Sequence, residues 1–149
     1  MITYNDLHAQ NHNITELSNV LLHLFNDRSM CDTGTCCELF HRYTEKVKEH
    51  LDLVDKNLYS KLLTHDDHDK QKMAKNFMAG SLEIRKIMAN YTKTWCPRKQ
   101  GGSLAIADHD LFIKDSVKMF ELILERIQNE TEKLYPLVRE LNENNEHAT

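Results

Sequence analysis

The sequence predicts an all-α protein, an up-down-up-down antiparallel four-helix bundle, and three observations lead to this prediction. The chain of 149 residues contains only 4 Gly and 2 Pro, whereas the two together usually make up roughly 12% of a protein. Apolar residues recur at alternating steps of three and four, the spacing that places them on one face of a helix. The breaks between the first three segments are short, so consecutive helices are expected to run antiparallel.

The first helix is expected before a polar loop at residues 26–34. Asn13 followed by Glu16 resembles a capping box, which would begin the helix there. No strong helix breaker precedes Asn13, so the helix can also extend back through Leu7. Its apolar stripe consists of Ile14, Leu17, Leu21 and Leu24.

The second and third helices are separated by a polar turn at residues 64–70. The stripe of the second contains Cys36, Phe40, Tyr43, Val47, His50, Val54, Leu58 and Leu62. The stripe of the third contains Met73, Phe77, Gly80, Ile84, Ile87, Tyr91 and Trp95. A glycine inside a helix costs about 1 kcal/mol relative to alanine. Gly80 therefore indicates close packing, or a space kept for another group.

The fourth helix is expected from about residue 107 to residue 141. The third helix should end by Cys96, before Pro97, and residues 97–103 form the connection. The inner stripe of the fourth helix contains His109, Phe112, Ser116, Met119, Ile123, Ile127 or Arg126, Glu130, Leu134 and Leu137. With a polar tail from about residue 142, residues 1–149 form a single domain.

Composition and charge exclude several classes of function. With 19 basic and 23 acidic residues the net charge is −4, so no basic surface for nucleic acid is expected. There is no apolar run long enough to span a membrane and no secretory signal at the N-terminus. The four cysteines are therefore expected to be thiols in a cytoplasmic protein. No phosphate-binding glycine loop, catalytic triad or recognisable carboxylate pair occurs, which argues against an enzyme.

Two stretches resemble a known family. The second helix reads FHRYTEKVKEHLDLVDKNLYSKLL and the fourth contains RIQNETEKLYPLV. Both are similar to the H-x-x-x-E and LYP motifs of the hemerythrin-like (HHE cation-binding) family. The resemblance covers nearly the whole chain, and it implies a four-helix bundle that holds a non-haem di-iron centre.

The ligand set implied by the resemblance is depleted. His50 matches the histidine of the second-helix motif, but Val54 stands where the family has glutamate. Glu130 matches the glutamate of the fourth-helix motif, but Arg126 stands where the family has histidine. The family's histidine on the third helix would fall near Gly80.

The remaining candidate ligands are His12, His50 and Glu130, with Glu83 as a distant addition. His12 is chosen because it lies level with His50 on the other side of the first loop. This set is too small for a complete di-iron centre, so two alternatives stay open. Either a single iron or zinc ion binds there, or an Arg126–Glu130 ion pair replaces the metal.

The cysteines form a second candidate site. In the predicted topology the first and third connections lie at one end of the bundle, opposite the half that holds His50. The site would contain Cys31, Cys36, Cys37, Cys96, His23, His41 and His109. Thiolate and imidazole together suit zinc, and a disulfide could join the 31–37 segment to Cys96. Alternatively, the thiols pack as small apolar groups.

These observations lead to competing hypotheses about function. The first is a non-catalytic, hemerythrin-like regulatory or sensor protein that binds iron or zinc, or responds to oxygen, nitric oxide or oxidants. The second is a metal-free helical bundle with a cysteine redox switch that binds another protein or forms a homodimer. An enzyme such as a ferroxidase is the weakest, because ligands are missing.

Overall fold

The computed structural model describes residues 4–31, 33–64, 66–96, 106, 108–137 and 140. These residues form helices and contain no strand, which confirms the prediction of an all-α helical bundle. The connection expected at 97–103 and the tail expected from 142 lie outside the described residues. The elements are α1 Tyr4–Asn26, α2 Gly34–Val54, η1 Asp55–Tyr59, α3 Ser60–Leu63, α4 His68–Trp95, α5 His109–Asn129 and η2 Glu130–Leu134.

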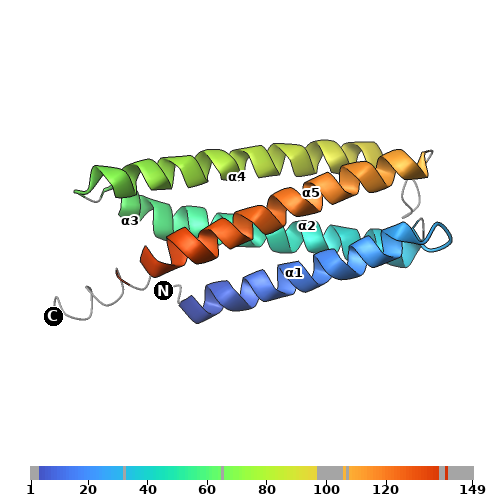
Figure 1. Ribbon diagram of the computed structural model, residues 1–149, viewed down its shortest axis with the longest axis horizontal. Helices are drawn as coiled ribbons and strands as arrows, with labels where there is room; N and C mark the ends of the chain where they lie inside the picture. The colour runs from blue at the N-terminus through green and yellow to red at the C-terminus, as the bar shows by residue number, and fades with distance from the viewer. Residues whose placement is uncertain are drawn as a thin grey trace.

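The long helices α1, α2, α4 and α5 lie side by side (Figure 1). Helix α1 packs against α2 and α5, while α4 packs against α5 and α2. In Figure 1 each long helix runs opposite to the one before it, so the α1–α2 connection, the end of α4 and the start of α5 share one end. The short α3 lies at the other end, before the start of α4.

The helix starts follow from capping residues in the sequence. Thr33 precedes α2 and its hydroxyl accepts a hydrogen bond from the backbone N–H of Cys36. Asp67 and Asp108 cap α4 and α5 in the same way, as side-chain oxygens do for the unpaired N–H groups of a first turn. Of the two starts expected for α1, the structure has the earlier one, because α1 begins at Tyr4 and not at Asn13.

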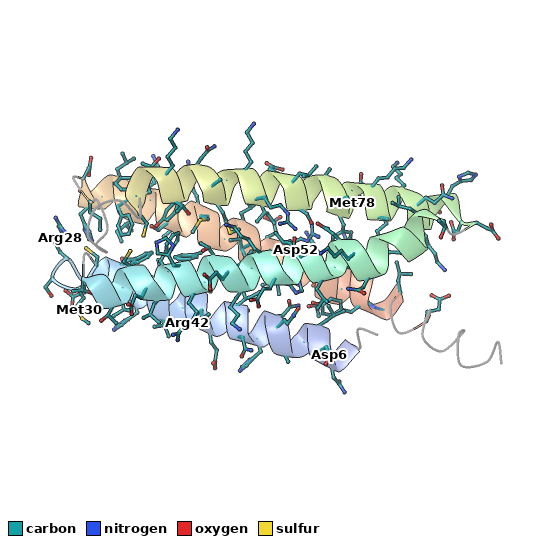
Figure 2. The ribbon with its side chains drawn as sticks, turned by 180° about the vertical axis from the view of Figure 1, so that it is seen from behind. Asp6, Arg28, Met30, Arg42, Asp52 and Met78 are labelled. Carbon is teal, nitrogen blue, oxygen red and sulfur yellow. The ribbon has the colours of Figure 1, made fainter. Side chains whose placement is uncertain are left out.

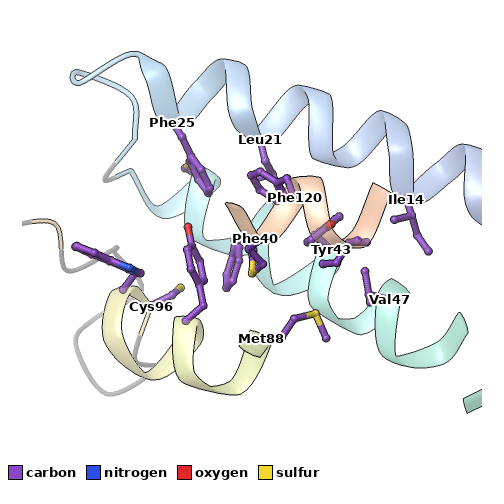
Figure 3. Close-up of a cluster of buried hydrophobic side chains, with 14 of the residues drawn as sticks. Ile14, Leu21, Phe25, Phe40, Tyr43, Val47, Met88, Cys96 and Phe120 are labelled. Atoms are coloured by element: carbon purple, nitrogen blue, oxygen red, sulfur yellow. The ribbon is translucent and has the colours of Figure 1, made fainter. Parts of the chain in front are cut away.

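The core has two apolar clusters. The larger contains most of the aromatic side chains and all four cysteines, and Figure 3 shows Phe25, Phe40 and Cys96 within it. The smaller cluster lies around Tyr135 and contains Leu7, Val54, Leu62, Ala74, Phe77 and Leu134. Buried His50 belongs to neither cluster and lies on α2 between Val47 of one and Val54 of the other. Arg126 and Glu130 are also buried and belong to neither cluster, and we refer to His50, Arg126 and Glu130 as the polar layer.

Two π-helical turns interrupt the expected helices. In η2 the backbone N–H of Tyr135 donates to the carbonyl of Glu130, five residues back. The extra residue in this turn shifts the inner face, so Leu134 and Tyr135 are both fully buried. The expected stripe passed from Leu134 to Leu137 and missed Tyr135, whose ring contacts His8 of α1.

Candidate functional site

The polar layer is centred on the carboxylate of Glu130, which is fully buried. Its Oε2 accepts a hydrogen bond of 2.6 Å from Nε2 of His50. Its Oε1 accepts one of 3.0 Å from Nε of Arg126, one helical turn earlier. Both carboxylate oxygens therefore have a charged or polar partner, as a buried carboxylate requires.

Arg126 is also held by α4 on the other side of its guanidinium. Nη1 donates to the carbonyl oxygen of Phe77 at 2.7 Å, and Nη2 donates to the hydroxyl of Ser81 at 3.0 Å. The guanidinium carbon lies 4.7 Å from the centre of the Phe77 ring, within the range of a cation–π interaction. A Cβ atom on Gly80 would lie 2.9 Å from Nη1. The glycine expected to leave space for another group thus lies against this guanidinium.

The side chain of α1 that reaches His50 is Gln10 and not the expected His12. Oε1 of Gln10 lies 2.8 Å from Nδ1 of His50. His12 is exposed over 70% of its side chain and pairs with the exposed Glu16 at 3.3 Å. Gln10 and the buried Ile14 are four residues apart and share a helix face, whereas His12 lies on the opposite side. The expectation that His12 joins His50 and Glu130 is wrong.

Glu83, the distant candidate ligand, also stays outside the polar layer. Its side chain is exposed on α4. It lines a groove of about 470 Å³ between α4 and α5, to which Gly80 and Arg126 contribute as well. Glu83 is therefore a surface residue beside the layer.

These contacts favour the second of the two alternatives left open for the half that holds His50. The Arg126–Glu130 ion pair is present and buried. A metal ion at His50 and Glu130 would need the carboxylate oxygens that Arg126 and His50 occupy. It would also have to lie beside a guanidinium that stays charged. The residues present therefore do not fit an iron centre.

The second candidate site gathers three ligand atoms at the other end of the bundle. The Sγ atoms of Cys37 and Cys96 lie 2.9 Å apart. Nε2 of His41 lies 3.3 Å from Sγ of Cys96. All three ligand atoms lie within 4.8 Å of one another. We refer to Cys37, His41 and Cys96 as the thiol–imidazole site.

Local structure positions each residue of the thiol–imidazole site. Cys37 lies in the first turn of α2, and its backbone N–H donates to the carbonyl of Thr33. His41 is four residues later and therefore projects from the same face of the helix. Cys96 follows the last residue of α4, and its N–H donates to the carbonyl of Thr92. The site thus joins the start of α2 to the end of α4.

The other four expected members of this site have different environments. Buried Cys31 lies in the α1–α2 connection, at the end where Figure 2 labels Arg28 and Met30, and its Sγ lies 3.4 Å from Nη1 of Arg28. Buried Cys36 packs in the larger cluster. His23 is exposed, and His109 donates from Nε2 to the carbonyl of Phe25 at 2.8 Å.

All four cysteines do gather in one cluster, and none is in a disulfide. The predicted topology brings the chain segments of all seven expected residues to one end, which is why they form one candidate site. The spacing of four between Cys37 and His41 was the available signal that these two share a helix face. The expected link between the 31–37 segment and Cys96 left open which cysteine of that segment lies beside Cys96, and the structure places Cys37 there.

Comparisons with protein-family models, with curated proteins and with solved structures find no match for this chain. The similarity to hemerythrin-like proteins therefore stays a prediction that rests on the two stretches of sequence. Among the described residues, no helix is both long enough and apolar enough to cross a membrane.

Proposed function

We propose that this protein is a non-catalytic regulatory bundle that binds a zinc ion at Cys37, His41 and Cys96. The observation that carries this proposal is the convergence of two thiols and one imidazole nitrogen within 4.8 Å. Thiolate and imidazole are the ligands that zinc prefers in proteins, and both cysteines are buried.

The two sulfur atoms of the site lie closer together than two thiolates on one zinc ion. Tetrahedral zinc with bonds to sulfur of about 2.3 Å holds two thiolates about 3.8 Å apart. The Sγ atoms of Cys37 and Cys96 lie 2.9 Å apart, so binding would separate them by about 0.9 Å. Three protein ligands leave a fourth coordination position for water or for another donor.

The surroundings of the site favour a structural and regulatory role. Phe40, Tyr91 and Trp95 are buried in the same cluster as Cys37 and Cys96. Because the ligands come from α2 and from the end of α4, the bound ion would cross-link two helices, and its binding energy would add to the stability of the fold.

Elemental analysis of the full chain, purified anaerobically and dialysed after exposure to zinc, tests this proposal. About one zinc ion per chain is expected in the parent. Cys37→Ser, Cys96→Ser and His41→Ala should each lose it, with circular dichroism confirming that they fold. Cys31→Ser is the matched control and should keep the metal. A well-folded parent without zinc, or a Cys37→Ser variant that keeps it, would contradict the proposal.

A second candidate function uses the same sulfur atoms without a metal. The 2.9 Å contact between Cys37 and Cys96 favours a thiol–disulfide switch in a bundle that binds another protein. In this case the metal-free parent should change its mobility on a non-reducing gel after mild oxidation. Cys96→Ser should abolish the change. The absence of any change in the parent would exclude this candidate.

A further inference from the structure

Metal binding and disulfide formation at the thiol–imidazole site would use the same two sulfur atoms. Sγ of Cys37 and Sγ of Cys96 lie 2.9 Å apart. A disulfide needs about 2.05 Å, and two thiolates on zinc need about 3.8 Å. The observed contact is therefore about 0.9 Å from each of these states, and the two states exclude each other.

We propose that hydrogen peroxide oxidises Cys37 and Cys96 to a disulfide and thereby releases the zinc ion. This inference rests on the proposed function, and it makes the metal content of the protein a measure of peroxide. Release follows because a disulfide sulfur has no thiolate charge to bind the ion, since the metal ligand is the thiolate. His41 alone then remains, and one imidazole cannot retain zinc.

The chemistry balances with peroxide as the only oxidant. One thiolate attacks an oxygen of peroxide, the O–O bond breaks, and a sulfenic acid and hydroxide form. The other thiolate attacks this sulfur, so that the S–S bond forms and the S–O bond breaks. Two protons from solvent convert the two hydroxide ions to water. Two electrons have passed from the sulfurs to peroxide, and Zn²⁺ leaves.

The position of Cys37 and Cys96 in the fold explains why the bundle should stay folded when a disulfide replaces the metal. Cys37 lies at the start of α2 and Cys96 immediately after α4, 59 residues apart in the chain. Both the metal and the disulfide join these two points, so one cross-link replaces the other. A disulfide that closes a long loop restricts the unfolded chain strongly. The oxidised bundle should therefore remain folded, and His41, which is only partly buried, loses its bond to the ion.

The other two cysteines provide matched controls within the chain. Cys31 and Cys36 are buried in the same cluster. Among the described residues, neither belongs to the group whose ligand atoms gather within 4.8 Å. Cys31→Ser and Cys36→Ser should therefore leave both zinc binding and its release unchanged.

The test uses the zinc-loaded full chain and a colorimetric zinc chelator. Hydrogen peroxide is added in steps up to two equivalents, and released zinc is compared with the disulfide found by peptide mass spectrometry. We expect one zinc released per Cys37–Cys96 disulfide, and rebinding after a thiol reductant. Mapping on the parent requires no substitution and so does not depend on the folding of any variant.

The outcomes separate this inference from the proposed function. If the protein forms the disulfide and keeps its zinc, or releases zinc with a disulfide that involves Cys31 or Cys36, the inference is wrong and zinc binding stands. Zinc retained with both thiols reduced after two equivalents of peroxide also overturns it. If the parent binds no zinc before peroxide is added, the proposed function fails, and this inference fails with it.

Discussion

The guanidinium of Arg126 lies directly against the backbone of Gly80, in the space that a side chain at position 80 would need. A Cβ atom there would lie 2.9 Å from Nη1. This nitrogen is not free to retreat, because it donates to the carbonyl of Phe77. The contact explains a glycine in the middle of a helix, where it costs about 1 kcal/mol relative to alanine.

Replacing Gly80 by alanine should therefore destabilise the protein, although alanine favours helix. The new methyl group must displace Arg126 from its hydrogen bonds to Phe77 and Ser81. We expect a net loss of about 1–2 kcal/mol, measured by urea unfolding. Ala79→Gly, on the exposed side of the same helix, gives the propensity effect alone, a loss of about 1 kcal/mol. A Gly80→Ala variant more stable than the parent would show that Arg126 moves away from the new methyl group at little cost.

Glu130→Gln should be one of the most destabilising single substitutions in the chain. It removes the negative charge that Arg126 and His50 share in a fully buried position. Breaking a buried pair and leaving one charge behind costs about 3–5 kcal/mol. Glu125→Gln, at an exposed position of the same helix, is the control and should change the free energy of unfolding by less than about 0.5 kcal/mol. Equal losses of unfolding free energy in the two variants would contradict the conclusion that Glu130 is a buried partner of Arg126 and His50.

Replacement by phenylalanine should change the stability of the fold differently at two buried tyrosines. The hydroxyl of Tyr91 lies 2.5 Å from Oγ of Ser116, so Tyr91→Phe should cost about 1 kcal/mol. The hydroxyl of Tyr43 is buried without a hydrogen-bond partner among the described residues. Tyr43→Phe should therefore be neutral, or stabilise the fold by up to about 1 kcal/mol. Thermal unfolding of the two variants beside the parent measures the difference, and a destabilised Tyr43→Phe variant would indicate a bound water or another partner.

The same tyrosines should make the fold sensitive to alkali. Burial raises the pKa of both Tyr43 and Tyr91 well above the ordinary value of 10.0. Because the folded state keeps these phenols protonated while the unfolded chain releases their protons, their contribution is complete below about pH 10 and decreases as the pH rises further. Urea unfolding at about pH 8 and about pH 11 should show this loss. Tyr91→Phe should reduce the dependence, and an identical dependence in the variant would assign it to other groups.

Most of the helical architecture follows from the sequence, because helix formation depends on neighbours a few residues away. The apolar stripes placed Phe40, Tyr43 and His50 on the inner face of α2, where they are buried. Helix α4 ends at Trp95, before Pro97, and the four cysteines lie in one cluster. Both features follow from chain order and topology. Each of these features depends on helix period, on capping or on the direction of successive helices.

What the sequence could not provide is the pairing of side chains between helices. That Gln10 and not His12 faces inward follows from the stripe through Ile14 once α1 begins at Tyr4. The contact of Gln10 with His50 depends on how α1 packs against α2. The burial of Tyr135 depends on a π-helical turn that no local sequence pattern predicts.

The same limit applies to both candidate sites. Cys37, rather than Cys31 or Cys36, meets Cys96, and this choice depends on how α2 and α4 pack against each other. Arg126 reaches the carbonyl of Phe77 because Gly80 lets its guanidinium lie against α4. The sequence by itself determined most of the residues that face inward, though not Tyr135, and the end of the bundle at which they lie. Only the tertiary structure decided which of them touch, because contacts across helices depend on rotations and shifts that are set by the packing of the whole core.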